Sequence, residues 1–146
     1  MTVASATIIH DVVLKVRDII NDNVTDPIAT TRASTSKFCM TGFPDRPAQY
    51  PIIIVSLASM SDRKMGMNNE STMVDMQLQI DILAKDVRQK DNLADSVYDK
   101  LRTAQVSTTL PYKMYDFKLI SISDLDEPGE TGLRRKVMLV SYTVVT

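Results

Sequence analysis

Chemically versatile side chains are scarce in this chain, which has one cysteine, one histidine and no tryptophan among 146 residues. A single cysteine, Cys39, excludes an intrachain disulfide and cannot hold a metal ion by itself. Lys37 nearby would lower a thiol pKa, but no histidine is close in sequence, so we assign Cys39 no nucleophilic role. The lone His10 lies on the flank of an expected helix and is interpreted as a surface residue, because general base catalysis needs partners within reach.

Long apolar runs and an excess of basic charge are also missing. Nothing approaches the roughly 18 consecutive apolar residues of a membrane span, and the N-terminus lacks the pattern of a secretory signal, so the expected compartment is the cytoplasm. The net charge is −1, which gives no bulk electrostatic case for nucleic-acid binding. With 44% hydrophobic and 24% charged residues, we expect residues 1–146 to form a single globular domain.

The acidic and basic side chains do not suggest a reaction centre. Asp75 and Asp81 lie six residues apart on an expected strand, about 20 Å at strand rise, which is too far for a glycosidase pair. The acidic turn at 124–130 lacks the spacing of a calcium loop. The basic run Arg134–Lys136 is expected to pair with carboxylates across strands. We therefore predict no enzyme, no catalytic residue, no cofactor and no metal site.

One strong strand pattern stands at the centre of the sequence. From Val74 to Ala84 every even position is apolar, and Asp75, Gln77, Gln79 and Asp81 occupy the odd positions from 75 to 81. Side chains alternate between the two faces of a strand, so this pattern predicts one apolar and one polar face. Such alternation is typical of a half-buried antiparallel sheet. We expect the polar face to lie toward solvent or toward a channel.

A helix pattern follows this strand at once. Asp86 offers an N-cap acceptor, and Gln89 three residues later has capping-box spacing. Apolar residues then recur at steps of three and four, which predicts a surface helix of about 18 residues with one docked face. These residues are Leu93, Ala94, Val97, Leu101 and Ala104.

The remaining elements complete an αββαββ order. A first helix is expected from about Ser5 to Asn23, with Ile8, Ile9, Val12, Val13, Val16, Ile19 and Ile20 in its apolar stripe. Residues 59–70 are expected to be a polar hairpin connection. The further expected strands are Pro51–Ala58, Asp116–Ser123 and Leu133–Val145. Paired strands with helices set on one face predict an α+β fold, with a mostly antiparallel sheet of about four main strands and two helices packed on one face.

Residues 23–50 show no sustained periodicity and contain three prolines. An irregular segment of this length is uncommon inside a compact domain and is often functional. Its apolar residues are candidates either for clamping the segment down or for meeting a neighbour, and the methionine-containing tip near 63–67 is a second candidate contact surface or simple loop filler. The candidate interface residues are Phe38, Met40, Phe43, Arg63, Lys64, Met65 and Met67.

This order of elements, together with three stretches of sequence, resembles the small tail-terminator and neck proteins of tailed phages. The resemblance covers most of the chain from residue 51 to 146 and the leading helix, and leaves 23–50 unmatched. The stretches are YPIIIV, MVDMQLQIDILAKD running into VRQKDNLADSVYDKLRTA, and the closing RKVMLVSYTVV.

The resemblance implies a structural virion protein that forms a ring, usually a hexamer, which caps the finished tail tube and joins it to the head connector. Its partners would be other copies of itself, the tail tube protein and connector or neck proteins, after assembly in the host cytoplasm. Duplex DNA would pass through without specific binding, and Asp75, Gln77, Gln79 and Asp81 would face solvent or the channel. Lysine at Asp75 and Asp81 should then leave folding intact and impair DNA passage or assembly.

Two alternatives stay open at this point. The first is a head-closure or connector-adaptor protein of the same virion neck. The second is a small α+β binding module for a small molecule or an enzyme. A hydrophobic pocket with convergent polar groups in the monomer would favour the binding module, whereas a mass consistent with a ring would favour a neck role.

Overall fold

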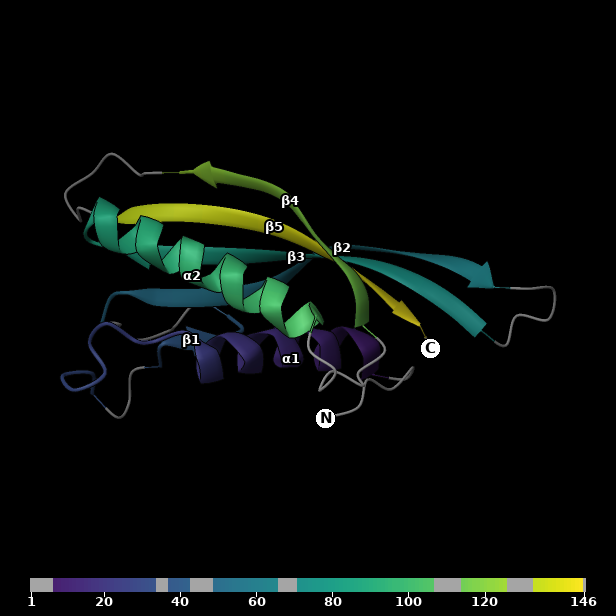
Figure 1. Cartoon of the computed structure of the whole chain (residues 1–146), viewed down its shortest axis with the longest axis horizontal. Helices are drawn as coiled ribbons and strands as arrows, with labels where there is room; N and C mark the ends of the chain where they lie inside the picture. Colours follow the sequence, from purple (N-terminus) through teal and green to yellow (C-terminus); the bar gives the residue numbers. More distant parts are fainter. Residues whose placement is uncertain are drawn as a thin grey trace.

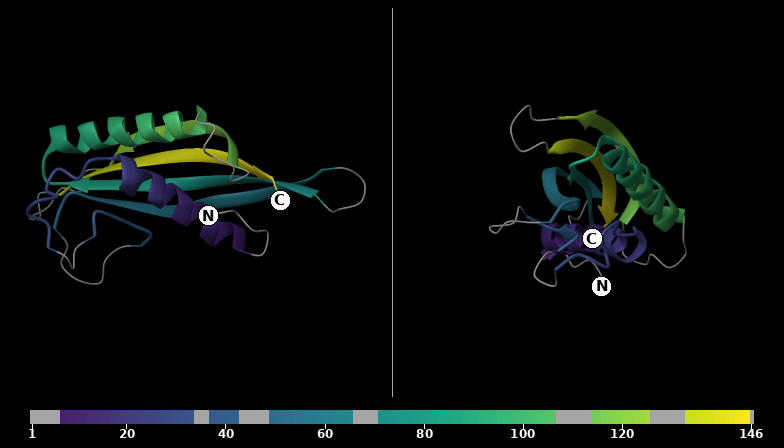
Figure 2. Two further views of the ribbon diagram at one scale, coloured as in Figure 1. Left: turned by 60° about the horizontal axis from the view of Figure 1, so that its bottom comes forward. Right: turned by 90° about the vertical axis from the view of Figure 1, so that its left-hand side faces the viewer.

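The computed structural model is a curved five-stranded sheet with two helices packed on one face (Figures 1 and 2). The elements are α1 (Ile8–Asn23), β1 (Cys39–Met40), β2 (Ile52–Met65), β3 (Ser71–Ala84), α2 (Val87–Val106), β4 (Met114–Asp124) and β5 (Arg134–Val145). The structure describes residues 7–33, 37–42, 49–65, 71–106, 114–125 and 133–145, with the backbone alone at 63–65, 71–72 and 105–106.

The strands lie in the order β1-β2-β3-β5-β4, and every neighbouring pair is antiparallel except β1 with β2. The α+β class and the mostly antiparallel sheet agree with the sequence prediction, but the sheet has one strand more than the four main strands expected. The additional strand, β1, has two residues and lies within the segment that the sequence left irregular. Two residues are too few to show alternation, so no pattern in the sequence marks them.

The strand β3 occupies the middle of the sheet, as its alternating pattern predicts (Figure 1). Val74 and Leu78 are 6% and 0% exposed and belong to one core that includes side chains from both helices. Burying an aliphatic side chain of this kind stabilises a fold by about 1.5–3 kcal/mol. The even-numbered side chains of β3 therefore form the sheet side of the core. The helix residues of this core include Val12 and Val16 of α1, and Val97 and Leu101 of α2.

The helix α2 begins where its capping residue predicts. The Asp86 carboxylate accepts a hydrogen bond from the backbone N–H of Arg88 at 3.2 Å, which satisfies one of the unpaired donors of the first turn. The apolar stripe is buried as expected. Lys90, three residues before Leu93, lies in the same stripe. The side chain of Lys90 is only 1% exposed. No helix within the described parts of the chain is both long and apolar enough to cross a membrane.

The helix α1 buries a narrower stripe than the sequence predicts. Val12, Val16 and Ile20 are fully buried, but Ile9 remains 42% exposed and Val13 is only partly buried. The prediction for Ile9 was therefore wrong. The first turn of α1 lies beside the edge of β2, where the sheet provides no further strand to cover it (Figure 2).

The hairpin of β2 and β3 is longer than the sequence predicts. Residues 59–65 were expected in a polar connection, but the ladder continues to the pair Met65 and Ser71. Backbone groups form the ladder whatever the side chains are, and this part of the hairpin projects beyond the two helices (Figure 1). With no helix over it, neither face needs apolar residues, so the alternation that marks a half-buried strand is absent there.

Within residues 23–50, the part that the structure describes is fastened by Arg32. Its guanidinium binds both carboxylate oxygens of Asp26, at 2.6 and 3.0 Å. It also donates to the backbone carbonyls of Gln49 and Pro51, and its centre lies 5.4 Å from the ring centroid of Phe38. Arg32 thus ties the turn after α1 to the beginning of β2.

Candidate interface at the two sheet edges

The polar face of β3 points away from the helices but is not uniformly open. Asp75, Gln77 and Gln79 are half-buried, whereas Asp81 is 1% exposed. The expectation that Asp81 faces solvent is therefore wrong within the isolated chain. Its carboxylate accepts hydrogen bonds from the Gln79 amide, one at 3.0 Å, and lies 3.3 Å from the guanidinium of Arg135.

The predicted pairing of the basic run at 134–136 with carboxylates is confirmed for Arg135 and Lys136. Besides the contact of Arg135 with Asp81, Lys136 binds Asp91 at 2.7 Å and Asp124 at 3.4 Å. Asp124 also binds the buried Lys90 at 3.0 Å. The hydrogen bond from Lys90 and the charges of both lysines outweigh burial and lower the pKa of Asp124. The hydrogen bond to Asp91 is the largest cause that raises the pKa of Lys136, although burial opposes it.

This charged cluster joins α2 to β4 and β5. Among the described residues, no three histidine, cysteine or acidic side chains are grouped closely enough for a metal. Asp124 was expected in a solvated acidic turn, and it is 55% exposed while paired with lysines. The sequence signal that was missed is the helical spacing of Lys90, which continues the buried stripe one turn before Leu93 and Ala94.

Of the residues proposed for contact with a neighbour, Phe38 is 7% exposed and belongs to the core. It therefore clamps its own segment, which was the other role expected for it. Met40 is partly buried. Phe43 and Met67 lie outside the described residues, and residues 63–65 are described by their backbone alone. Only Phe38 and Met40 of these seven residues have described side chains, so the structure does not define a contact cluster from this set.

Cys39 is a buried core residue with an unreactive environment. Burial raises its pKa to about 12, although the positive charge of Arg17 acts in the opposite direction. A raised pKa lowers the fraction of thiolate, which is the reactive form of cysteine.

We expect the Cys39 thiol to react with a disulfide reagent about a thousandfold more slowly in the folded chain than in the unfolded chain at pH 8. A pKa near 12 instead of 9.0 lowers the thiolate fraction by about that factor. The measurement compares labelling rates in buffer and in concentrated guanidinium chloride. Similar rates in the two conditions would contradict the burial of this thiol.

The first open edge of the sheet is the part of β2 beyond β1. The strand β1 pairs only with Ile53 and Ile54, and no other described strand lies on that side of residues 55–65. We call residues 55–65 the free stretch of β2. Unpaired N–H and C=O groups on such an edge are a template for pairing with another chain.

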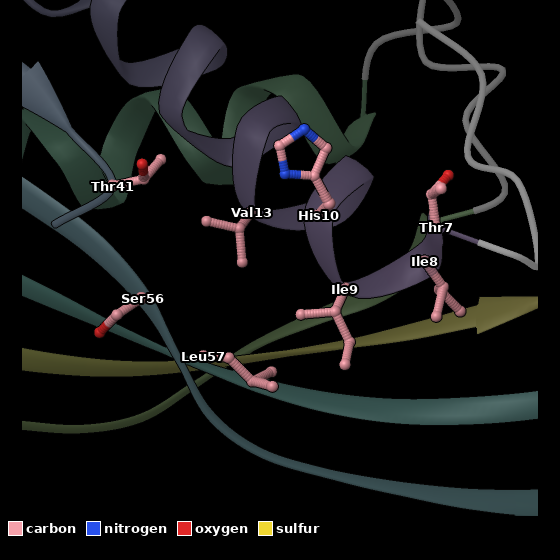
Figure 3. A pocket seen from close by; sticks show the side chains of 8 residues that line it. All are labelled: Thr7, Ile8, Ile9, His10, Val13, Thr41, Ser56 and Leu57. Atoms are coloured by element: carbon pink, nitrogen blue, oxygen red, sulfur yellow. The ribbon is translucent and has the colours of Figure 1, made fainter.

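A groove of about 590 Å³ lies between this free stretch and the beginning of α1. In Figure 3, the aliphatic side chains of Ile9, Val13 and Leu57 are directed into the space between the helix and the strand, whereas the ring of His10 lies away from β2. The hydroxyl groups of Ser56 and Thr41 point away from each other (Figure 3). The lining residues that the structure describes are therefore mainly apolar and do not provide the convergent polar groups of a small-molecule site.

The second open edge is β4, at the other end of the sheet. Its pairing with β5 is interrupted by two register shifts, and Asp116 at the first of them has a φ of 56°. Four of its residues or immediate neighbours are large, hydrophobic and 42–52% exposed. They are Tyr115, Ile120, Ile122 and Leu125.

Exposed apolar side chains are concentrated at these two edges. Seven large hydrophobic residues are exposed in the described parts of the chain, and four of them belong to β4 or directly follow it. Met60 belongs to the free stretch of β2, Ile9 lines the groove beside it, and only Val87 lies elsewhere, at the start of α2. The concentration of these side chains at strand edges without a described partner makes these edges the candidate interaction surfaces of the chain.

No known family model matches the sequence, and no curated protein matches it. The fold is similar to that of a chain in the virion of a native gene transfer agent particle, with a TM-score of 0.57. The two chains are 12% identical, and the similarity covers 87% of this chain and 92% of the other. At this identity the likeness concerns the fold.

Proposed function

We propose that this chain is a structural virion protein of the tail-terminator type. Copies would form a ring, usually a hexamer, that caps the tail tube and joins it to the head connector. The observation that carries the proposal is the likeness of fold to a virion chain over 87% of the sequence. The exposed hydrophobic side chains at the two sheet edges support it, because a protein that works by assembly needs surfaces that remain exposed in the monomer.

The charge balance is compatible with a ring through which DNA passes. A wall lined with lysine and arginine would bind phosphate groups and hinder passage, and the net charge of −1 shows no such excess. The half-buried Asp75, Gln77 and Gln79 contribute acidic and amide groups to this face of the sheet, which they share with the basic side chains of Lys118 and Arg135. In this proposal they face the channel or the solvent, and Asp81 does not take part because it is buried.

The test is to assemble particles without this chain. We expect filled heads and tube-bearing tails that do not join, and we expect the purified chain, added afterwards, to restore joining and infectivity. The mass of the purified chain in solution, measured by light scattering, should match a ring or become that of a ring when tail tubes are added.

Particles that still join without the chain would contradict a role at this junction. Heads that lose their DNA while tails remain normal would instead indicate head closure, the alternative in the same virion neck. A catalysed reaction of the purified chain would contradict both structural roles.

A further inference from the structure

We propose that copies of this chain join head to tail by strand pairing, with β4 of one copy lying antiparallel beside the free stretch of β2 of the next copy. This inference rests on the proposed ring and names the surfaces that would hold it together. The occupant of the groove beside β2 is then a second copy, which places Ile122 of its β4 in the groove.

The strand directions suit this arrangement. Each of the steps from β2 to β3, from β3 to β5 and from β5 to β4 is antiparallel, so β4 runs opposite to β2. A copy related by rotation, placed with its β4 beside β2, therefore continues the alternation of directions across the boundary. The pairing needs no inversion of the sheet, and both open edges find a backbone partner.

The side chains on the helix side of the two edges are complementary. Leu57 pairs with the fully buried Leu78, and Ile122 pairs with the fully buried Met138, so both residues lie on the helix side of the sheet. Placing Ile122 opposite Leu57 directs it into the groove beside Ile9 and Val13, which lacks an apolar occupant from the described residues. Ile122 is 42% exposed in the single chain. In the pair it would be buried in the groove and would cover the apolar side chains that line the groove.

The residues on the face away from the helices are compatible with the same register, in which Leu57 lies opposite Ile122. The β2 ladder shifts between Leu57 and Ser59. With Ala58 as the extra residue of this bulge, Ser59 comes to lie opposite Ser121 when Leu57 is opposite Ile122. Ser59 pairs with Gln77, and Ser121 with Leu139, which places both on the face away from the helices. Both serines are exposed in the single chain. In this register two small polar side chains would therefore face each other on the side of the sheet away from the helices.

Pairing of unlike edges explains why exposed apolar side chains lie at both edges. Two β2 edges placed together would bring two grooves together with nothing to fill them, and two β4 edges would leave both grooves empty. A contact between different surfaces uses each edge once and closes into a ring when the rotation permits.

Cysteine cross-linking tests the proposed contact directly. The double variant Ser59→Cys with Ser121→Cys, oxidised under assembly conditions, should give a ladder of disulfide-linked multimers on a non-reducing gel. Each single variant alone should remain monomeric, and an equal mixture of the two should give dimers only. The native Cys39 can stay in place because it is buried. Dimers from one single variant alone, or a double variant that stays monomeric, would overturn the proposal.

A charge in the groove provides an independent readout with a matched control. Ile122→Lys should weaken self-association by at least about tenfold, because the introduced ammonium would lose its water in an apolar groove. Val87→Lys changes a residue of similar exposure, 45% against 42%, away from both edges and should have no effect. A ring that forms equally in both variants would refute this contact but leave the proposed function standing. Particles that join without the chain would refute the function while the cross-links still report on the edges.

Discussion

Replacing Asp81 with lysine should lower the free energy of unfolding by about 3–5 kcal/mol, the usual cost of breaking a buried ion pair. Asp81 is 1% exposed and lies 3.3 Å from the guanidinium of Arg135. The variant removes this partner and places a second positive charge in the same buried position. Its strand neighbours across the sheet, Ile54 and Val137, are also buried and offer no compensating acceptor from their side chains.

The matched control is Asp75→Lys on the same face of the same strand. Asp75 is half-buried and accepts a hydrogen bond from the Thr143 hydroxyl at 3.1 Å, so we expect a loss of about 1 kcal/mol. Urea denaturation followed by circular dichroism measures both variants, because the chain has no tryptophan. Equal losses in the two variants would contradict the difference in burial. If they differ as expected, only Asp75→Lys is suitable for testing the effect of charge on DNA passage.

The difference between these two aspartates shows what the sequence can and cannot predict. The alternation along β3 assigns the two carboxylates to one face, and this is correct because the period of a strand is a local property. The depth of burial depends on the strands beside β3 and on their register. Asp81 lies between Ile54 and Val137, whereas Asp75 lies between Ser61 and Thr143. These pairings join distant parts of the chain, so no window of sequence contains them.

The same reasoning applies to the candidate interface. The pattern of residues 116–123 predicts a strand, and β4 covers these residues. Whether Ile120 and Ile122 are buried depends on β4 being an edge strand and on its register shifts against β5. The sequence predicted contact residues in loops because loops commonly carry function. The structure instead leaves apolar side chains exposed on strands, which only the completed sheet order reveals.

The second large effect is expected at Arg32. Arg32→Ala should lower the free energy of unfolding by about 2–4 kcal/mol, because it leaves Asp26 and two backbone carbonyls without their charged donor. The Arg32 side chain is 6% exposed, so water does not readily replace it. Arg32→Lys should recover only part of this loss, because one ammonium cannot reproduce the planar fork of the guanidinium. We call these contacts of Arg32 the Arg32 clasp. An Arg32→Ala variant that is as stable as the parent in urea would contradict a stabilising role of the clasp.

The clasp should also depend on pH in a defined direction. Burial alone would raise the pKa of Asp26, but the hydrogen bonds from Arg32 and from the N–H of Ile28, with the Arg32 charge, lower it below 3.8. A pKa lower in the folded state means that the stabilisation is complete well above pH 4 and is lost as the pH falls through the folded pKa. The stability difference between the parent and Asp26→Asn should therefore shrink between pH 6 and pH 3. A difference that stays constant or grows on acidification would show that the negative charge of Asp26 is not the source of this stabilisation.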